Sequence, residues 1–193
     1  MLGSRAVAMG IRIRHPSVAL SAQRRGLQDI AITRTGKPII RVQGGRSSLG
    51  GHTATVFGAT GFLGRYIVNR LARKGCTVVV PYREEMAKRH LKVSGDLGRV
   101  NFMEFDLRNT QSLEESVRHS DMVFNLIGRS YPTKNFSLRA VHVEGTERIA
   151  EAVAKYDVDR FIHVSSYNAD PRSPSHFFRT KVHLQGGLIP DKC

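Results

Sequence analysis

Three glycines at a fixed spacing constrain this chain more than any other feature. Gly58, Gly61 and Gly64 follow a short run of β-branched and aromatic residues, 53–57, and lead directly into an apolar pattern at helical spacing. A strand, a tight turn and a helix in this order form a dinucleotide-binding turn, whose glycines allow the sharp turn, the approach of the phosphates and the close packing of the helix. The N–H groups and the positive dipole end of the helix would face the phosphates. A glycine-rich turn that binds nothing is the alternative.

The rest of the chain alternates between two kinds of apolar pattern. Short β-branched runs that fit buried strands are separated by segments with helical spacing. This alternation predicts right-handed crossovers and an α/β fold with a doubly wound parallel sheet of about five strands. Asn109 or Thr110 is suited to cap a helix. We expect strands at 53–57, 77–80, 100–105, 122–127 and 160–165, and helices from residue 62 and at 84–91, 110–119, 137–156 and 175–181.

Positive charge is concentrated near the start of the chain. The net charge is +14, and the first 50 residues contain nine Lys or Arg against one acid, Asp29. An Arg-rich, acid-poor start with scattered Ser, Ala, Val and Leu is typical of a mitochondrial transit peptide, and a basic arm that binds nucleic acid is the alternative. The sequence has no run of about 18 apolar residues, so no spanning helix is expected.

These patterns divide the chain into four segments. We expect a transit peptide at 1–30, a linker loop at 31–51, a NAD(P)-binding domain at 52–184 and an irregular tail at 185–193. Gly186, Gly187 and Pro190 break the helical pattern in the tail, where a sixth strand and a substrate-binding lobe would otherwise follow, so we interpret the chain as truncated. The two cysteines predict neither a disulfide framework nor a zinc site.

The end of the second predicted strand indicates which dinucleotide fits. In NAD-specific sites an acid stands there and holds the ribose, whereas residues 80–83 read VPYR. Arg83 is available for a 2′-phosphate, so we expect NADP(H). Glu84 and Glu85 follow immediately and keep NAD(H) as the alternative. Further candidates lie at the ends of the third and fourth strands, where a ligand binds in such a sheet: Asp106, Leu107, Leu126, Ile127 and Gly128.

The form GATGFLG, residues 58–64, resembles the extended and atypical short-chain dehydrogenase/reductases, which have a Rossmann-like fold. The resemblance implies a reactive tyrosine, a lysine four residues later on the same helix face, a serine and an asparagine. Lys181 matches the lysine, and Ser165 or Ser166 the serine. Phe177, however, stands four residues before Lys181.

Two of the four catalytic positions are therefore replaced. Phenylalanine has no hydroxyl with which to exchange a proton, and His142 stands at the asparagine position. Tyr167 is a poor substitute because no lysine follows it four residues later. We expect no catalytic residue and no metal ligand. The expected cofactor-binding residues are Gly58, Thr60, Gly61, Phe62, Leu63, Gly64, Arg83, Asp106, Leu107, Leu126, Ile127, Gly128, Ser165 and Lys181.

A wider set of motifs resembles one particular group of proteins. The segments GGRSS (44–48), GHTATVFGATGFLGRY (51–66), GDLG (95–98), NLIGR (125–129) and FIHVSS (161–166) are similar to the short-chain-dehydrogenase-like accessory subunits of mitochondrial complex I, NADH:ubiquinone oxidoreductase, of fungal type. The resemblance implies a matrix-side subunit that holds NADPH structurally, near the ubiquinone-binding region, and supports assembly or stability of the respiratory chain complex. It implies other complex I subunits as partners, membrane association only through the complex, and a second lobe that is missing here.

Two other functions stay open at this point. The chain could be an active NADP-dependent short-chain reductase or epimerase, or a basic Rossmann protein that binds nucleic acid. The pI of about 10.6 favours the latter, but acids are interspersed throughout the predicted domain, which argues against nucleic acid as a partner.

Overall fold

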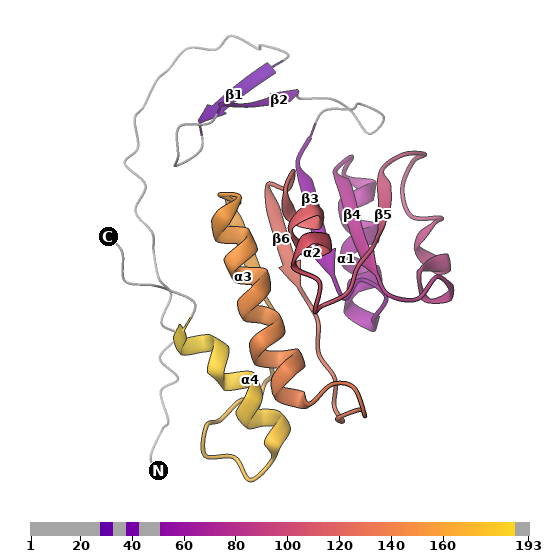
Figure 1. Cartoon of the computed structure of the whole chain (residues 1–193). Coiled ribbons are helices and arrows are strands. Elements are labelled where there is room, and N and C mark those ends of the chain that lie inside the picture. Colours follow the sequence, from indigo (N-terminus) through magenta and orange to yellow (C-terminus); the bar gives the residue numbers. More distant parts are fainter. Residues whose placement is uncertain (1–27, 33–37, 43–50, 188–193) are drawn as a thin grey trace, which may run out of the picture.

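The computed structural model describes residues 28–32, 38–42 and 51–187. Strands β1 (Gln28–Ile32) and β2 (Pro38–Val42) form a separate antiparallel pair, in which Ile30 lies opposite Ile40 (Figure 1). The sequence patterns predict no strand in this region, which they divide between a transit peptide and a linker loop. The isoleucines of both strands have the β propensity that suits a strand.

Five parallel strands form the main sheet. They are β3 (Thr53–Phe57), β4 (Thr77–Tyr82), β5 (Val100–Glu104), β6 (Met122–Asn125) and β7 (Arg160–His163), in the order β5-β4-β3-β6-β7. The chain winds outward from β3 first to one side and then to the other, which confirms the doubly wound parallel sheet. The switch point lies between β3 and β6, where such sheets bind ligands at the carboxyl ends of the strands.

The strand ends differ slightly from the prediction. Strand β4 continues two residues further, to Tyr82, whereas β6 and β7 end two residues earlier than expected. Beyond β6, the N–H of Ile127 donates to the side-chain oxygen of Asn125 at 3.1 Å, so a side chain takes over a bond that the strand ladder would otherwise make. The polypeptide leaves the sheet at this point.

The helices follow the predicted order. They are α1 (Phe62–Arg73), the 3₁₀ helix η1 (Met86–Leu91), α2 (Thr110–Val117), the π-helical segment η2 (Ala140–Glu144), α3 (Gly145–Lys155) and α4 (His176–Gly187). Asn109 caps α2 as expected, because its side chain accepts from the N–H groups of Gln111 and Ser112. The helix expected at 137–156 thus contains a π turn, and α4 passes the expected domain end at residue 184.

The two faces of the sheet carry separate apolar clusters. Helix α1 and η1 cover one face around Val56 and Val68, and α2 and α3 cover the other around Phe57 and Ile149. In Figure 1, α2 and α3 lie on the near side of the sheet and α1 on the far side. Both faces of β3 are therefore buried, which holds the end of this strand and the turn after it in place. Within the described residues, no helix has the length and apolarity needed to cross a membrane.

Candidate nucleotide-binding site

The glycine turn has the close approaches that the sequence predicts. Gly58 has a φ of 75°, and a Cβ there would lie 3.0 Å from the carbonyl carbon of Leu126. A Cβ on Gly64 would lie 2.5 Å from the Cα of Ala59, so only glycine lets α1 pack this close to the end of β3. Gly61 donates its N–H to the carbonyl of Gly58 at 3.1 Å and tightens the turn.

The start of α1 presents bare backbone. Its N-cap is Gly61, which has no side chain to cap the helix, and the first turn contains no acid. The first helical bond runs from the N–H of Arg65 to the carbonyl of Gly61, so the N–H groups of residues 62–64 precede it. These groups and the helix dipole make the turn a suitable cradle for a phosphate.

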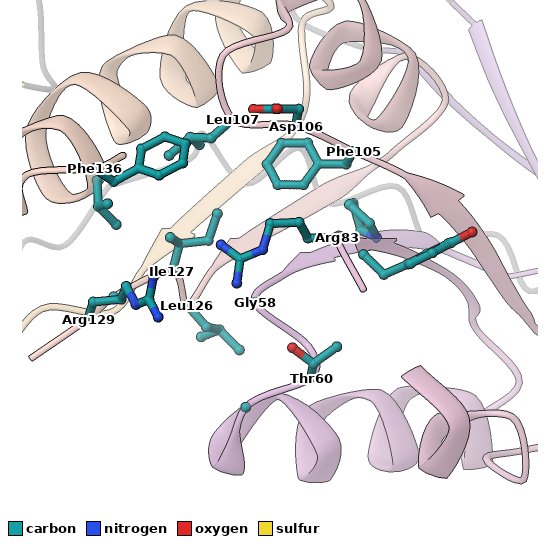
Figure 2. Close-up of a pocket in the computed structure, with 15 residues that line it drawn as sticks. Gly58, Thr60, Arg83, Phe105, Asp106, Leu107, Leu126, Ile127, Arg129 and Phe136 are labelled. Carbon is teal, nitrogen blue, oxygen red and sulfur yellow. The ribbon is translucent and has the colours of Figure 1, made fainter. Parts of the chain in front are cut away.

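A half-open cavity of about 330 Å³ lies over this turn. Figure 2 shows Thr60 beside the start of α1, Asp106 and Phe105 at the opposite side, and the guanidinium of Arg83 between them. The strand ends and the loops after them supply all of the lining residues except Val141, which belongs to η2, as expected for a ligand at a switch point. The lining is Gly58, Thr60, Gly61, Pro81, Tyr82, Arg83, Phe105, Asp106, Leu107, Leu126, Ile127, Gly128, Arg129, Phe136 and Val141.

Nine of the fourteen expected residues line this cavity: Gly58, Thr60, Gly61, Arg83, Asp106, Leu107, Leu126, Ile127 and Gly128. The other five do not line it. The side chains of Phe62 and Leu63 point to solvent, and Gly64 is used for packing. Ser165 and Lys181 lie behind the wall, where the Ser165 hydroxyl donates to the backbone carbonyl of Lys181 at 3.1 Å.

Sequence reasoning missed six of the lining residues. Pro81, Tyr82 and Phe105 directly precede expected residues at strand ends, and Arg129 directly follows one, so proximity in sequence could have identified these four. Phe136 and Val141 come from the loop after β6 and from η2, and no local pattern marks them. Arg108 lies over the Phe136 ring with its guanidinium carbon 4.2 Å from the ring centre, which helps to fix that loop.

At the end of β4, an arginine lines the cavity and no acid stands at the strand tip. Arg83 follows β4, and its guanidinium lies 3.5 Å from the carboxylate of Glu84, with both side chains exposed. Such an exposed pair contributes little to stability, so the guanidinium is free to exchange partners. Asp106 instead shapes its own turn, since one carboxylate oxygen accepts from the N–H of Arg108 at 2.8 Å.

Lys181 is buried behind the opposite end of the cavity. Its side chain is 6% exposed, and its ammonium lies 3.5 Å from the carbonyl oxygen of Ile127. A Cβ on Gly128, which lines the cavity, would lie 3.0 Å from the same nitrogen, so the ammonium lies directly against the backbone of a lining residue. Burial lowers the pKa of Lys181. The lysine therefore stands where its charge can reach a ligand across the wall.

Two aromatic rings occupy the positions of the family's tyrosine and asparagine. The His142 ring is fully buried and meets the Phe177 ring edge to face, with centroids 5.3 Å apart. Burial, reinforced by the charge of Lys181, lowers the pKa of His142 to about 4. Neither ring carries a hydroxyl, and Tyr167 is fully exposed to solvent. Among the described residues, this end of the site therefore lacks the tyrosine proton donor of the dehydrogenases.

A second imidazole lies in the same region. His163 ends β7, and neither of its buried ring nitrogens has a hydrogen-bond partner in the described part of the chain. Burial, with the charge of Lys181 as the smaller cause, lowers the pKa of His163 to about 4. The charge of Lys181 lowers the pKa of both histidines, and that of His163 also lowers the pKa of His142, with no carboxylate among the causes of these shifts. Over the described residues, no cluster of His, Cys, Asp and Glu could hold a metal ion.

Comparison with known proteins identifies relatives with similar sequences. The "NADH-ubiquinone oxidoreductase 40 kDa subunit, mitochondrial" of Neurospora crassa is 78% identical over 166 residues, which cover 86% of this chain and 44% of that protein. The mitochondrial "NADH dehydrogenase (ubiquinone) 1 alpha subcomplex subunit 9" of Mus musculus is 49% identical over 141 residues, 72% of this chain and 37% of that protein. The chain thus spans less than half the length of these two relatives.

A solved structure and a family match agree on the fold. The X-ray structure of Pen from Bacillus thuringiensis superposes with a TM-score of 0.62 at 19% identity, over 68% of this chain and 42% of that one, a likeness of fold alone. The family described as "NAD dependent epimerase/dehydratase family" matches residues 54–183, which include the cavity and all of the five-stranded sheet except its first residue, Thr53. This chain therefore belongs to the NAD dependent epimerase/dehydratase family.

Proposed function

We propose that this chain is a non-catalytic, NADPH-binding accessory subunit of mitochondrial complex I. One observation carries the proposal: the phosphate turn and the buried Lys181 are in place, while Phe177 stands where the reactive tyrosine would be. The chain keeps the groups that hold a nucleotide and lacks the group that exchanges a proton with a carbonyl substrate. Bound nucleotide would then add stability to the fold, because a ligand that binds the native state shifts the folding equilibrium.

The relatives support the assembly. The Neurospora and mouse proteins are both named as mitochondrial subunits of an NADH-ubiquinone oxidoreductase, and the former shares 78% of its aligned residues with this chain. The Arg-rich start fits import into mitochondria, and we place the chain on the matrix side of the inner membrane. Its partners would be other subunits of the complex, which would also supply its association with the membrane.

The cavity supports the phosphorylated form of the nucleotide. Gly58, Gly61 and the start of α1 would hold the diphosphate, and Arg83 would pair with a 2′-phosphate in place of Glu84. Lys181, behind Gly128, would lie toward the nicotinamide end, because the two ends of a dinucleotide fall on opposite sides of the switch point. When bound, NADPH would supply a hydride donor, and Phe177 stands where the proton-donating tyrosine of the dehydrogenases would lie.

Nucleotide extraction from the purified complex tests this proposal. We expect NADP(H) at about one molecule per complex, and a complex without NADP(H) would refute it. With the 193-residue chain, Arg83→Ser should weaken NADPH binding by about tenfold or more while NADH binding stays the same, since one charge-assisted pair is worth about 1.5–3 kcal/mol. Arg89→Ser is the matched control, because Arg89 is also exposed but does not line the cavity.

The other functions lack a comparable observation. An active reductase or epimerase needs a proton donor four residues before Lys181, and Phe177 stands at that position without a hydroxyl. A nucleic-acid-binding role would need an uninterrupted basic surface, whereas ion pairs such as Lys155 with Glu114, at 2.7 Å, neutralise charge on the helices.

A further inference from the structure

His142 lies where the helix after β6 departs from α-helical geometry. Residues 140–144 form a π turn within a continuous helical stretch, and the ring of His142 in this turn is fully buried. A π turn inside an α-helix is uncommon and is frequent at functional sites. Val141, from the same turn, lines the cavity. The irregular turn therefore directs neighbouring side chains to the cavity and to its supporting wall.

The hydrogen bonds of the ring assign one tautomer. The backbone N–H of Arg129 donates to Nε2 at 3.1 Å, so Nε2 carries no proton. Nδ1 then carries the proton and donates to the Thr180 hydroxyl at 2.8 Å, and that hydroxyl donates to the carbonyl of Phe177 at 2.9 Å. In this series of three hydrogen bonds, from Arg129 through His142 and Thr180 to Phe177, each donor has one acceptor. A second proton on the ring would break the bond to Arg129.

This series connects the cavity wall to a distant helix. Arg129 ends the loop 126–129, whose residues line the cavity, and Thr180 belongs to α4, which packs against η2. The ring thus lies between two segments that are far apart in sequence. The wall is close to it, because a Cβ on Gly128 would lie 3.8 Å from Nε2. A shift of α4 would move the ring and, through it, the wall.

We propose that His142 is a positioning residue, which holds residues 126–129 in the shape that lines the nucleotide cavity and joins this loop to α4 through Thr180. Binding of the nucleotide and packing of α4 then depend on each other. The identity of the ligand rests on the proposed function, whereas the link between loop and helix does not. The groups that act electrostatically on the ring are Lys181, His163 and His176, all basic, so the neutral ring persists at physiological pH.

A change at Thr180 tests the link without altering the cavity lining. Thr180→Val keeps the shape of the side chain but removes the acceptor for Nδ1–H, while Thr180→Ser restores it. Thr55→Val is the matched control, since the Thr55 hydroxyl is also buried and also donates to a backbone carbonyl, that of Ser116 at 2.7 Å, away from the cavity. The full 193-residue chain is used, with NADPH affinity and the exchange rate of the Arg129 amide hydrogen as readouts.

Thr180→Val should weaken NADPH binding and speed Arg129 amide exchange by about tenfold, the effect of losing one hydrogen bond. Thr180→Ser and Thr55→Val should change neither, although Thr55→Val also lowers stability. Wild-type values for both readouts in Thr180→Val would overturn the inference.

If Thr180→Val does not fold, the ring nitrogen shifts of the wild-type chain in NMR decide: a protonated Nε2, or a ring that titrates near pH 6.5, overturns it. A wild-type chain that binds no NADPH would refute the proposed function, and the Arg129 exchange rates would still test the positioning role.

Discussion

The ring of His142 meets the ring of Phe177 edge to face, with the two planes inclined by 81°. In the dehydrogenases that this chain resembles, the same two positions carry an asparagine and a tyrosine that cooperate in proton transfer. Here they pack as an aromatic pair, a geometry that stabilises a buried contact. With both residues exchanged, this part of the site consists of two packed rings instead of the asparagine and tyrosine of the dehydrogenases, while the glycine turn is unchanged.

Restoring the tyrosine alone should not restore activity. Phe177→Tyr adds a hydroxyl four residues before Lys181, but both ring nitrogens of His142 are already hydrogen-bonded to Arg129 and Thr180, so neither is free to hold a water in the site. We expect no NADPH oxidation with a panel of aldehydes and ketones. The double variant Phe177→Tyr with His142→Asn restores both positions and serves as the comparison. Turnover by Phe177→Tyr alone would contradict this account.

Removing the buried charge of Lys181 should change stability in a pH-dependent way. Its folded pKa lies below that of the unfolded chain, so the unfolded state binds the proton more tightly and the free energy of unfolding rises with pH up to about 10.5. Lys181→Met removes this dependence. We expect the variant to gain most over the wild type at neutral pH and least above pH 10.5, as measured by urea unfolding. A stability gain of Lys181→Met over the wild type that grew with pH would contradict the lowered pKa of Lys181.

The two histidines with lowered pKa values should make the stability of the fold sensitive to acid. Their folded pKa values of about 4 lie below the ordinary 6.5, so the unfolded chain takes up protons first as the pH falls. The free energy of unfolding should therefore decrease between about pH 6.5 and 4, with no further loss from these groups below that range. His163→Phe should reduce the slope by up to about one proton per molecule. An unchanged slope in denaturant titrations would contradict the buried neutral state of His163.

Two glycines of the phosphate turn should separate packing from binding. Gly64→Ala places a Cβ 2.5 Å from the Ala59 backbone and should cost about 1–3 kcal/mol of unfolding free energy. Gly61 has an ordinary φ of −77°, and its added Cβ would meet only the Gly58 carbonyl at 3.3 Å. Gly61→Ala should therefore cost about 1 kcal/mol or less, yet reduce NADPH affinity by about tenfold or more by blocking the phosphates. If Gly61→Ala and Gly64→Ala lost NADPH affinity in the same proportion to their loss of unfolding free energy, the separation of packing from binding would be refuted.

Short-range patterns in the chain were enough to predict the five strands of the main sheet, their parallel arrangement and the sharp glycine turn after β3. Each depends on residues close in sequence: a glycine is needed where the backbone turns or approaches, and β-branched runs fit strands covered on both faces. The ends of β6 and the length of α4 were less accurate, because side-chain bonds such as that from Ile127 N–H to Asn125 decide where the ladder stops.

The cavity wall and its support depended on packing between distant segments. Phe136 and Val141 reach the cavity only because the chain folds back after β6, and Lys181 becomes buried only when α4 packs against the π turn. The bond between His142 and Thr180 joins residues 38 positions apart. The amino-acid sequence determines which hydrogen bonds a side chain is able to make. The tertiary structure decides which partner it meets and how far it is removed from water, and therefore also its pKa.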